Sequence, residues 1–158
     1  MDLDLDPSAG MMYWTEAAPG EVAVFRARLD GTGMEGIVSS GGESPSGIAV
    51  DPSAGKIYWT DRNVGVIHRA NTDGSGQETF LSSGIIDPVR IVLDVPQGRI
   101  YWTEASPADF MISRANLDDS GMELLVTGLT SPSGIDLDRE SSSTPALNVT
   151  WGRLKSRD

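Results

Sequence analysis

Apolar and polar residues alternate in short runs along most of the chain, and turn-forming residues separate the runs. The clearest run is Ile57-Tyr58-Trp59-Thr60-Asp61. With a period of two, Ile57 and Trp59 lie on one face of a strand, and Tyr58 and Thr60 lie on the other. Both faces carry apolar bulk, which predicts a strand covered on both sides. The three- to four-residue spacing of an amphipathic helix is missing, so we expect an all-β fold.

This run is repeated along the chain. Its tyrosine recurs 45 residues earlier, at Tyr13, and 43 residues later, at Tyr101. All three tyrosines and three of the four tryptophans belong to the copies, which excludes chance recurrence. The repeated motif consists of Tyr13, Trp14, Thr15 and Glu16; Tyr58, Trp59, Thr60 and Asp61; and Tyr101, Trp102, Thr103 and Glu104.

Each motif lies inside a longer unit of four predicted strands. A short apolar strand that ends in Asp comes first, followed by a turn with Pro and Gly such as Pro52–Gly55. The motif is the second strand, and a third strand ends in Arg-Ala. An Asp-Gly turn such as Asp73-Gly74, a strong hairpin signal, leads to the fourth strand. Four antiparallel strands in 43 to 45 residues are typical of a β-propeller blade.

The predicted architecture is therefore three propeller blades and the first strand of a fourth. The blades span residues 1–46, 47–89 and 90–133, and the partial unit spans residues 134–138. We expect residues 139–158 to form a degenerate polar tail, because the segment is rich in Ser and Trp151 does not fit the spacing of the motif.

Such a partial propeller leaves two bare blade faces. A fragment of a longer chain, a homodimer of two half-rings, and pairing with another half are the three ways to cover them. We favour the fragment, because Met1–Asp6 already supplies a first strand, and Gly134–Asp138 of a partner copy would compete for the same place.

Composition narrows the choice of partners. The formal net charge of −11 argues against binding to nucleic acid and is compatible with a protein ligand that has a basic surface. Cysteine is absent, which excludes disulfides and thiolate metal sites. No apolar run approaches the roughly 18 residues of a membrane-spanning helix, and the amino-terminal residues do not resemble a signal peptide.

The charged residues of the repeat are interpreted as structural. We expect Glu16, Asp61 and Glu104 to form ion pairs with the third-strand arginines Arg26, Arg69 and Arg114, across a hairpin. The strand-ending Asp6, Asp51, Asp94 and Asp138 are expected to accept backbone hydrogen bonds in their turns.

Neither a metal nor a catalytic group is predicted. Asp2, Asp4 and Asp6 share a strand face that would line the central channel, where calcium is conceivable, but a recognisable calcium loop is missing. His68, the one histidine, is interpreted as an ordinary strand residue. The sequence thus predicts no catalytic residue, no cofactor and no metal site.

The repeat unit resembles the YWTD repeat, which is the class B repeat of the low-density lipoprotein receptor family. The resemblance rests on the motif, on the Asp51-Pro52 turn before it and on the Asn71-Thr72-Asp73-Gly74 turn after it. The resemblance covers residues 1–138, in three copies of a blade that family propellers contain six times. It implies that the motif is framework and that one rim of loops meets protein ligands. The most variable loops of this chain are residues 17–21, 62–65 and 105–109.

The expected function is therefore a non-enzymatic protein-recognition or scaffolding module, part of a larger receptor-like protein. The alternative is a six-bladed-propeller hydrolase or lactonase with a metal at the channel mouth. For a fragment, the resemblance implies an extracellular or cell-surface location, whereas a complete chain without a signal peptide or membrane span would be cytoplasmic.

Overall fold

The computed structural model describes residues 1–16, 22–39, 44–105, 110–137 and 147–151. Within these ranges the chain forms strands, apart from turns and one short 3-10 helix, η1 (Val95–Gln97). No helix in the described ranges has the length and hydrophobicity that a membrane crossing demands. The strands are β1 (Leu3–Asp6), β2 (Met11–Thr15), β3 (Val22–Arg28), β4 (Glu35–Ser39), β5 (Pro45–Asp51), β6 (Lys56–Asp61), β7 (Val66–Asn71), β8 (Glu78–Leu81), β9 (Pro88–Asp94), β10 (Arg99–Ala105), β11 (Phe110–Asn116), β12 (Glu123–Leu129), β13 (Pro132–Leu137) and β14 (Leu147–Trp151).

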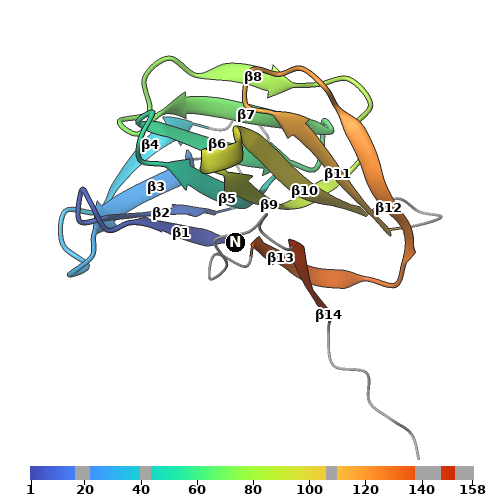
Figure 1. The fold of residues 1–158 in the computed structure, drawn as a ribbon. Coiled ribbons are helices and arrows are strands. Elements are labelled where there is room, and N and C mark those ends of the chain that lie inside the picture. Colours follow the sequence, from blue (N-terminus) through green and yellow to red (C-terminus); the bar gives the residue numbers. More distant parts are fainter. Residues whose placement is uncertain (17–21, 40–43, 106–109, 138–146, 152–158) are drawn as a thin grey trace, which may run out of the picture.

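The strands form consecutive antiparallel sheets that follow one another around a common centre (Figure 1). The first sheet contains β1 to β4, the second β5 to β8, and the third β9 to β12, each in sequence order. β13 and β14 form a two-stranded fourth unit. The predicted all-β fold of four-stranded blades is confirmed, while the exact blade boundaries stay predictions.

The fourth unit is larger than the sequence analysis predicted. β14 pairs with β13, with Leu137 opposite Leu147 and Ile135 opposite Val149. Alternating apolar and polar residues run through β14, but the Ser-rich segment before it breaks the spacing of the repeat and hid the strand. The sequence analysis predicted the first strand of this unit, and β14 adds a second strand to it. The other residues of the predicted tail, 138–146 and 152–158, lie outside the described residues.

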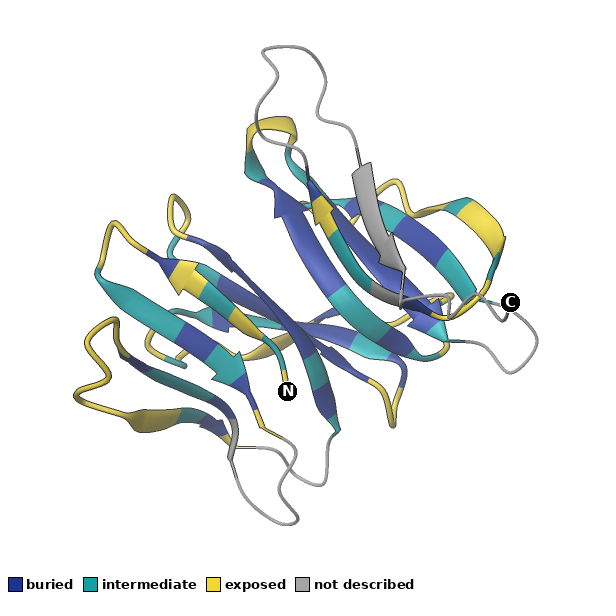
Figure 2. Ribbon diagram, turned by 90° about the horizontal axis from the view of Figure 1, so that it is seen from below, coloured by how far each residue is buried: buried dark blue, intermediate teal, exposed yellow. Residues whose placement is uncertain are grey.

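The core lies between the sheets, because the motif strands of the second and third sheets, β6 and β10, bury both of their faces. Trp59 packs with the first sheet, in a cluster of Tyr13, Val24, Val38, Ile48, Val50, Ile57, Trp59 and Ala70. Tyr58 packs with the third sheet, in a cluster that includes Ile67, Phe80, Leu81, Ile91, Leu93, Ile100 and Trp102. We call these two sides of a sheet its Trp face and its Tyr face. The predicted division of Ile57 and Trp59 from Tyr58 is confirmed, and buried positions follow the middle of each sheet in Figure 2.

A glycine allows close contact between neighbouring sheets. Gly74, in the turn between β7 and β8, has a φ of +84°, and a Cβ built there would lie 2.0 Å from the carbonyl oxygen of Ile37 on β4. Only glycine fits so close an approach in a left-handed conformation. In the third sheet Asp119 takes the matching position with a φ of 68°, as expected for a residue type that tolerates positive φ.

Candidate functional site

The third-strand arginines do not pair with the motif acids. The register places Arg69 opposite Tyr58, and Asp61 opposite Val66. Arg69 instead forms an ion pair with Glu78 on β8, with Nη2 and Oε1 2.5 Å apart, and its guanidinium carbon lies 4.8 Å from the ring centre of Phe80. Arg26 pairs with Glu35 and Arg114 with Glu123 in the same way. The predicted ion pairs were therefore wrong, because the partner acid lies on the fourth strand, outside the motif.

The three motif acids have three different environments. Glu104 is 1 % exposed and accepts hydrogen bonds from Trp102 Nε1 at 3.0 Å and Ser113 Oγ at 2.8 Å. Asp61 is fully buried and accepts from backbone amides, including that of Asn63 at 2.9 Å. Glu16 is exposed. These positions therefore do not form a ring of equivalent carboxylates.

Two of the motif threonines, Thr15 and Thr60, link their sheet to the next one. Thr15 Oγ1 donates to the carbonyl oxygen of Ser46 at 2.7 Å. Thr60 Oγ1 accepts from the amide of Gly47 at 2.7 Å and donates to the carbonyl oxygen of Val89, on β9, at 3.1 Å. These hydroxyls are buried and satisfied by backbone groups, so their contacts support a framework role for the motif.

The aspartates that end the first strands hold their turns, as predicted. Asp51 Oδ1 accepts from the amide of Ser53 at 2.9 Å and from that of Ala54 at 3.1 Å. Asp6 accepts from Ser8 Oγ at 2.5 Å, and this hydrogen bond lowers the pKa of the Asp6 carboxyl below its ordinary value of 3.8. Asp94 accepts from the amide of Gln97. Asp138 lies outside the described residues.

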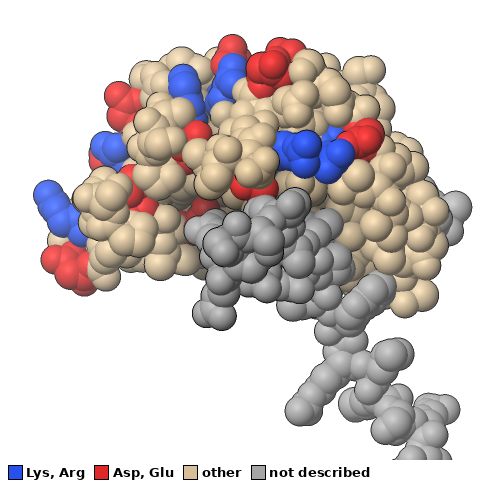
Figure 3. Space-filling view, viewed as in Figure 1, with Lys and Arg blue, Asp and Glu red and all other residues tan. Residues whose placement is uncertain are grey.

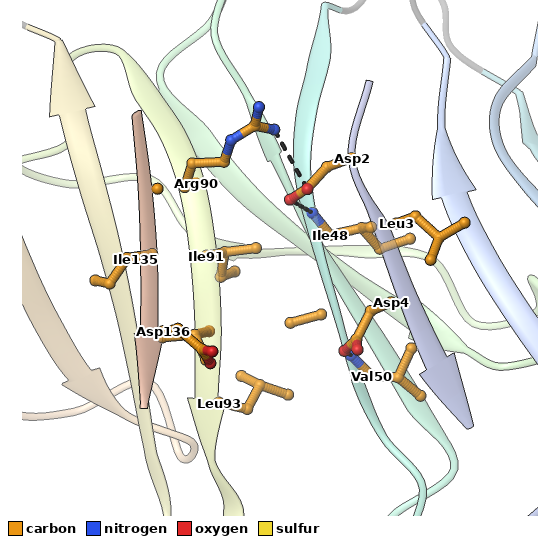
Figure 4. Close-up of a pocket in the computed structure, with 13 residues that line it drawn as sticks. Asp2, Leu3, Asp4, Ile48, Val50, Arg90, Ile91, Leu93, Ile135 and Asp136 are labelled. Carbon is orange, nitrogen blue, oxygen red and sulfur yellow. Dashed lines mark hydrogen bonds and ion pairs between the residues drawn. The ribbon is translucent and has the colours of Figure 1, made fainter. Parts of the chain in front are cut away.

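A cavity of about 370 Å³ lies between the first strands of the sheets (Figure 4). The charged side chains that line it are Asp2, Asp4, Arg90 and Asp136. Asp2 bridges two sheets, since Oδ1 lies 3.4 Å from Arg90 Nη1 and Oδ2 accepts from the amide of Ile48 at 3.2 Å. Asp4 Oδ2 accepts from the amide of Val50 at 2.8 Å. Asp2 and Asp4 therefore tie the first strand of one sheet to that of the next.

Metal ligands are not assembled in the part of the chain that the structure describes. No group of three or more His, Cys, Asp or Glu side chains there could hold a metal ion. His68 lies on β7, is 8 % exposed, and stacks on Trp59 with ring centres 5.3 Å apart. Its surroundings are those of a packed strand residue.

One rim of the second sheet combines exposed apolar and charged side chains. The turn after β6 carries Arg62, which forms a two-pronged ion pair with Asp87 at 2.7 and 2.8 Å. This hydrogen bonding raises the pKa of the Arg62 guanidinium. Val64 is 63 % exposed and Ile86 is 57 % exposed. We call Arg62, Val64, Ile86 and Asp87 the second-sheet rim.

The two segments of the second-sheet rim lie in close backbone contact. A Cβ at Gly65 would lie 2.9 Å from the carbonyl oxygens of Ile85 and Ile86, so the turn packs tightly on the link to the third sheet. The variable loop at residues 62–65 thus packs directly on the segment that leads to the third sheet. The other two variable loops, residues 17–21 and most of 105–109, lie outside the described residues.

On the face drawn in Figure 3, the charged side chains do not form a surface suited to binding nucleic acid. Acidic and basic side chains are interspersed there, and Lys and Arg do not gather into one patch. This agrees with the formal net charge of −11.

Comparison with known proteins identifies the repeat and the fold. Residues 10–52 match the family described as low-density lipoprotein receptor repeat class B. The nidogen propeller in the crystal structure of a nidogen/laminin complex is 29 % identical, with a TM-score of 0.80, over 87 % of this chain and 52 % of that chain. No curated protein sequence matches the chain significantly. The predicted resemblance to the YWTD repeat is confirmed.

Two bacterial structures share the fold at lower identity. A gluconolactonase from Xanthomonas campestris is 17 % identical, with a TM-score of 0.69, over 90 % of this chain and 50 % of that one. A putative TolB from Agrobacterium tumefaciens is also 17 % identical, with a TM-score of 0.59, over 77 % of this chain and 47 % of that one. These likenesses show the fold alone. The chain spans about half the length of all three structures.

Proposed function

We propose that this chain, a set of β-propeller blades with a low-density lipoprotein receptor class B repeat, is a non-enzymatic module for protein recognition in a larger receptor-like protein. The observation that carries the proposal is the likeness to nidogen, whose propeller was solved in a complex with laminin. The match covers about half of that propeller's chain, so a full ring needs as many sheets again.

The contacts of the motif favour recognition at a rim over chemistry at the motif. Trp59, Trp102 and Thr60 are fully buried, and Thr60 bonds to backbone groups of neighbouring strands. In the channel, Asp2 and Asp4 accept from backbone amides. These groups serve the fold, so groups that meet a ligand have to lie at the surface.

The second-sheet rim has the composition of a small recognition surface. Val64 and Ile86 offer exposed apolar area, and Arg62 and Asp87 flank them with both signs of charge. Apolar contacts surrounded by polar groups are typical of protein interfaces. Because the whole chain is acidic, a ligand with a basic surface would be attracted over a longer range.

Binding to laminin, the protein named with the nidogen structure, is the first test. We expect the immobilised 158-residue chain to bind laminin in surface plasmon resonance and a variant with Val64→Asp and Ile86→Asp to bind at least tenfold more weakly. Leu29→Asp, at an exposed position in the turn after β3, is the matched control and should bind normally. If the rim variant binds as well as the original chain, the second-sheet rim is not the contact surface. If the original chain does not bind laminin, the proposal that its recognition function follows that of nidogen is wrong.

The lactonase alternative is tested separately. Hydrolysis of gluconolactone by the purified chain, with and without added calcium, is expected to stay at the rate of the buffer. Turnover above that rate, lost on substitution of Asp136 in the channel, would overturn the non-enzymatic part of the proposal.

A further inference from the structure

Exposed apolar side chains gather where the second sheet meets the third. The second-sheet rim supplies Val64 and Ile86, which are 63 % and 57 % exposed. The outer strand of the third sheet and the turn before it supply Leu124 and Met122, which are 54 % and 37 % exposed. We call Val64, Ile86, Met122 and Leu124 the junction patch.

Two close contacts join the two halves of the junction patch. A Cβ built at Gly65, next to Val64, would lie 2.9 Å from the carbonyl oxygen of Ile86. A Cβ built at Gly84, on the same link, would lie 3.1 Å from Cε of Met122. This link follows β8 and runs beside the start of β12 (Figure 1). The patch is therefore one stretch of surface that crosses from the second sheet to the third.

The repeat does not need apolar side chains at these positions. We aligned the copies on the Glu that opens each outer strand and on the Pro that opens the next first strand. The matching residues are Gly36 and Thr79 for Leu124, and Glu43 and Thr130 for Ile86. Gly36 and Thr79 are exposed, so the position of Leu124 faces solvent in each of the three sheets. Exposed apolar groups that the packing of the blades does not require favour an interface.

A further departure from the repeat adds a carboxylate beside the patch. Asp119, three residues before Met122, has a φ of 68°, whereas the other two sheets have Gly31 and Gly74 at this position. Asp tolerates this left-handed conformation better than most residue types, but less well than glycine. Such positions are typical of sites where function requires a side chain.

The charges around the patch leave it acidic. Arg62 pairs with Asp87 and Arg114 pairs with Glu123, so both of these arginines are balanced. Asp118 and Asp119, in the turn between β11 and β12, are exposed, and neither forms an ion pair with another described residue. The two matching turns of the other sheets carry one Asp each, at residues 30 and 73.

We propose that the junction patch binds a segment of a partner protein in which apolar side chains stand next to Lys or Arg. The apolar side chains of the segment cover Ile86 and Leu124, and its cation meets the carboxylate of Asp119. This inference rests on the proposed recognition function, but not on laminin as the ligand. It extends the second-sheet rim onto the third sheet and names the chemistry that the surface recognises.

Peptides selected on the 158-residue chain test the proposal without laminin. We expect random phage-displayed peptides that bind the immobilised chain to share Ile, Leu or Phe next to Lys or Arg. The variant Met122→Gln with Leu124→Thr should bind these peptides about tenfold more weakly. It should keep the thermal midpoint of the original chain, because both changes introduce the residues of the second sheet, Gln77 and Thr79. The matched control is Met34→Gln, at an exposed position of the first sheet, which should bind normally.

The charge is tested with Asp119→Gly, which restores the glycine of the other two turns. We expect this variant to bind the selected peptides about threefold more weakly at low salt. The difference should vanish at about 1 M salt, which screens exposed charges. The thermal midpoint of the variant should be no lower than that of the original chain, since glycine suits positive φ. If no peptide is enriched, if the peptides lack basic residues, or if both variants bind them normally, the proposal is wrong.

Laminin binding separates this inference from the proposed function. Suppose that laminin binding is lost with Val64→Asp and Ile86→Asp but kept with Met122→Gln and Leu124→Thr. The proposed function then stands, and the extension of the surface onto the third sheet is wrong. If the chain instead does not bind laminin, but the selected peptides depend on Leu124 and Asp119, the inference stands and nidogen is a poor guide to the ligand.

Discussion

The buried carboxylate of Glu104 provides the sharpest test of how the motif stabilises a blade. Oε1 accepts hydrogen bonds from Trp102 Nε1 at 3.0 Å and Ser113 Oγ at 2.8 Å, and Oε2 accepts from the amide of Ile86 at 2.9 Å. The change Glu104→Gln keeps the shape of the side chain but replaces one acceptor oxygen by an NH2 donor. At least one of the three donors then faces another donor in a buried site.

The expected loss of stability in the Glu104→Gln variant can be worked out from these contacts. Hydrogen bonds to a charged group contribute about 1.5–3 kcal/mol each, and an unsatisfied buried group costs about 1–3 kcal/mol. The neutral amide is easier to bury than the carboxylate, which offsets part of the loss. We therefore expect the free energy of unfolding to fall by about 2–4 kcal/mol. For a chain of this size, the midpoint of thermal unfolding should fall by roughly 5–15 °C.

Urea unfolding followed by tryptophan fluorescence measures this change. The matched control is Glu16→Gln, the same substitution at the same motif position, because Glu16 is exposed. Exposed substitutions usually change stability by no more than about 0.5 kcal/mol. If Glu104→Gln destabilises the chain no more than Glu16→Gln does, the hydrogen bonds of Glu104 do not stabilise the third sheet and the reasoning fails.

Three further predictions concern packing, turns and pH. Trp59→Ala should lower the free energy of unfolding by about 3–5 kcal/mol in urea titration, because Trp59 is fully buried. Trp14→Ala should lower it by clearly less, because Trp14 is only half-buried on the Trp face of the first sheet. Equal losses for the two variants would contradict this difference in burial. Gly74→Ala should lower the midpoint of thermal unfolding far more than Gly55→Ala does. Both glycines have positive φ, but only Gly74 has a backbone oxygen 2.0 Å from the added Cβ. Similar midpoints for the two variants would contradict this close approach. The pKa of Asp6 is lowered by hydrogen bonding, so its carboxylate stabilises the fold above the unfolded pKa and loses this effect as pH falls through the folded pKa. Asp6→Asn should therefore lose less stability than the original chain between about pH 4 and pH 2, and an unchanged pH profile would contradict a role for this carboxylate.

Local patterns predicted the strands and turns, because they depend on residues close in sequence. The faces of Ile57 and Trp59 follow from a period of two, and the turn held by Asp51 follows from its Pro and Gly. The partner of Arg69 could not be predicted in this way. Its position opposite Tyr58 depends on the register of β6 with β7, and Glu78 lies on a strand without a recognisable motif.

Features that depend on the arrangement of whole units could not be predicted from local patterns. β14 follows a long Ser-rich segment, so its spacing from β13 differs from that of the other first and second strands. The second-sheet rim joins Arg62 with Asp87, 25 residues apart, and neither belongs to a motif. The variable loop at residues 62–65 was a useful signal for this rim, because it drew attention to one of its two segments.

The last position of the motif shows why a repeated acidic residue need not be a functional site. Glu104 is one methylene longer than Asp61, and it reaches back to Trp102 Nε1 and Ser113. Asp61 instead accepts from amides of the following turn, and Trp59 Nε1 has no hydrogen-bond partner among the described residues. Where the third sheet has Ser113, the second sheet has His68, whose ring stacks on Trp59 and replaces a polar contact by an aromatic one. The aromatic part of the motif is therefore packed in the same way in both sheets, while its acidic end adapts to the residue across the strand pair. A position that varies from sheet to sheet in this way serves the packing of each blade, which agrees with the proposal that recognition takes place at the loops of the rim.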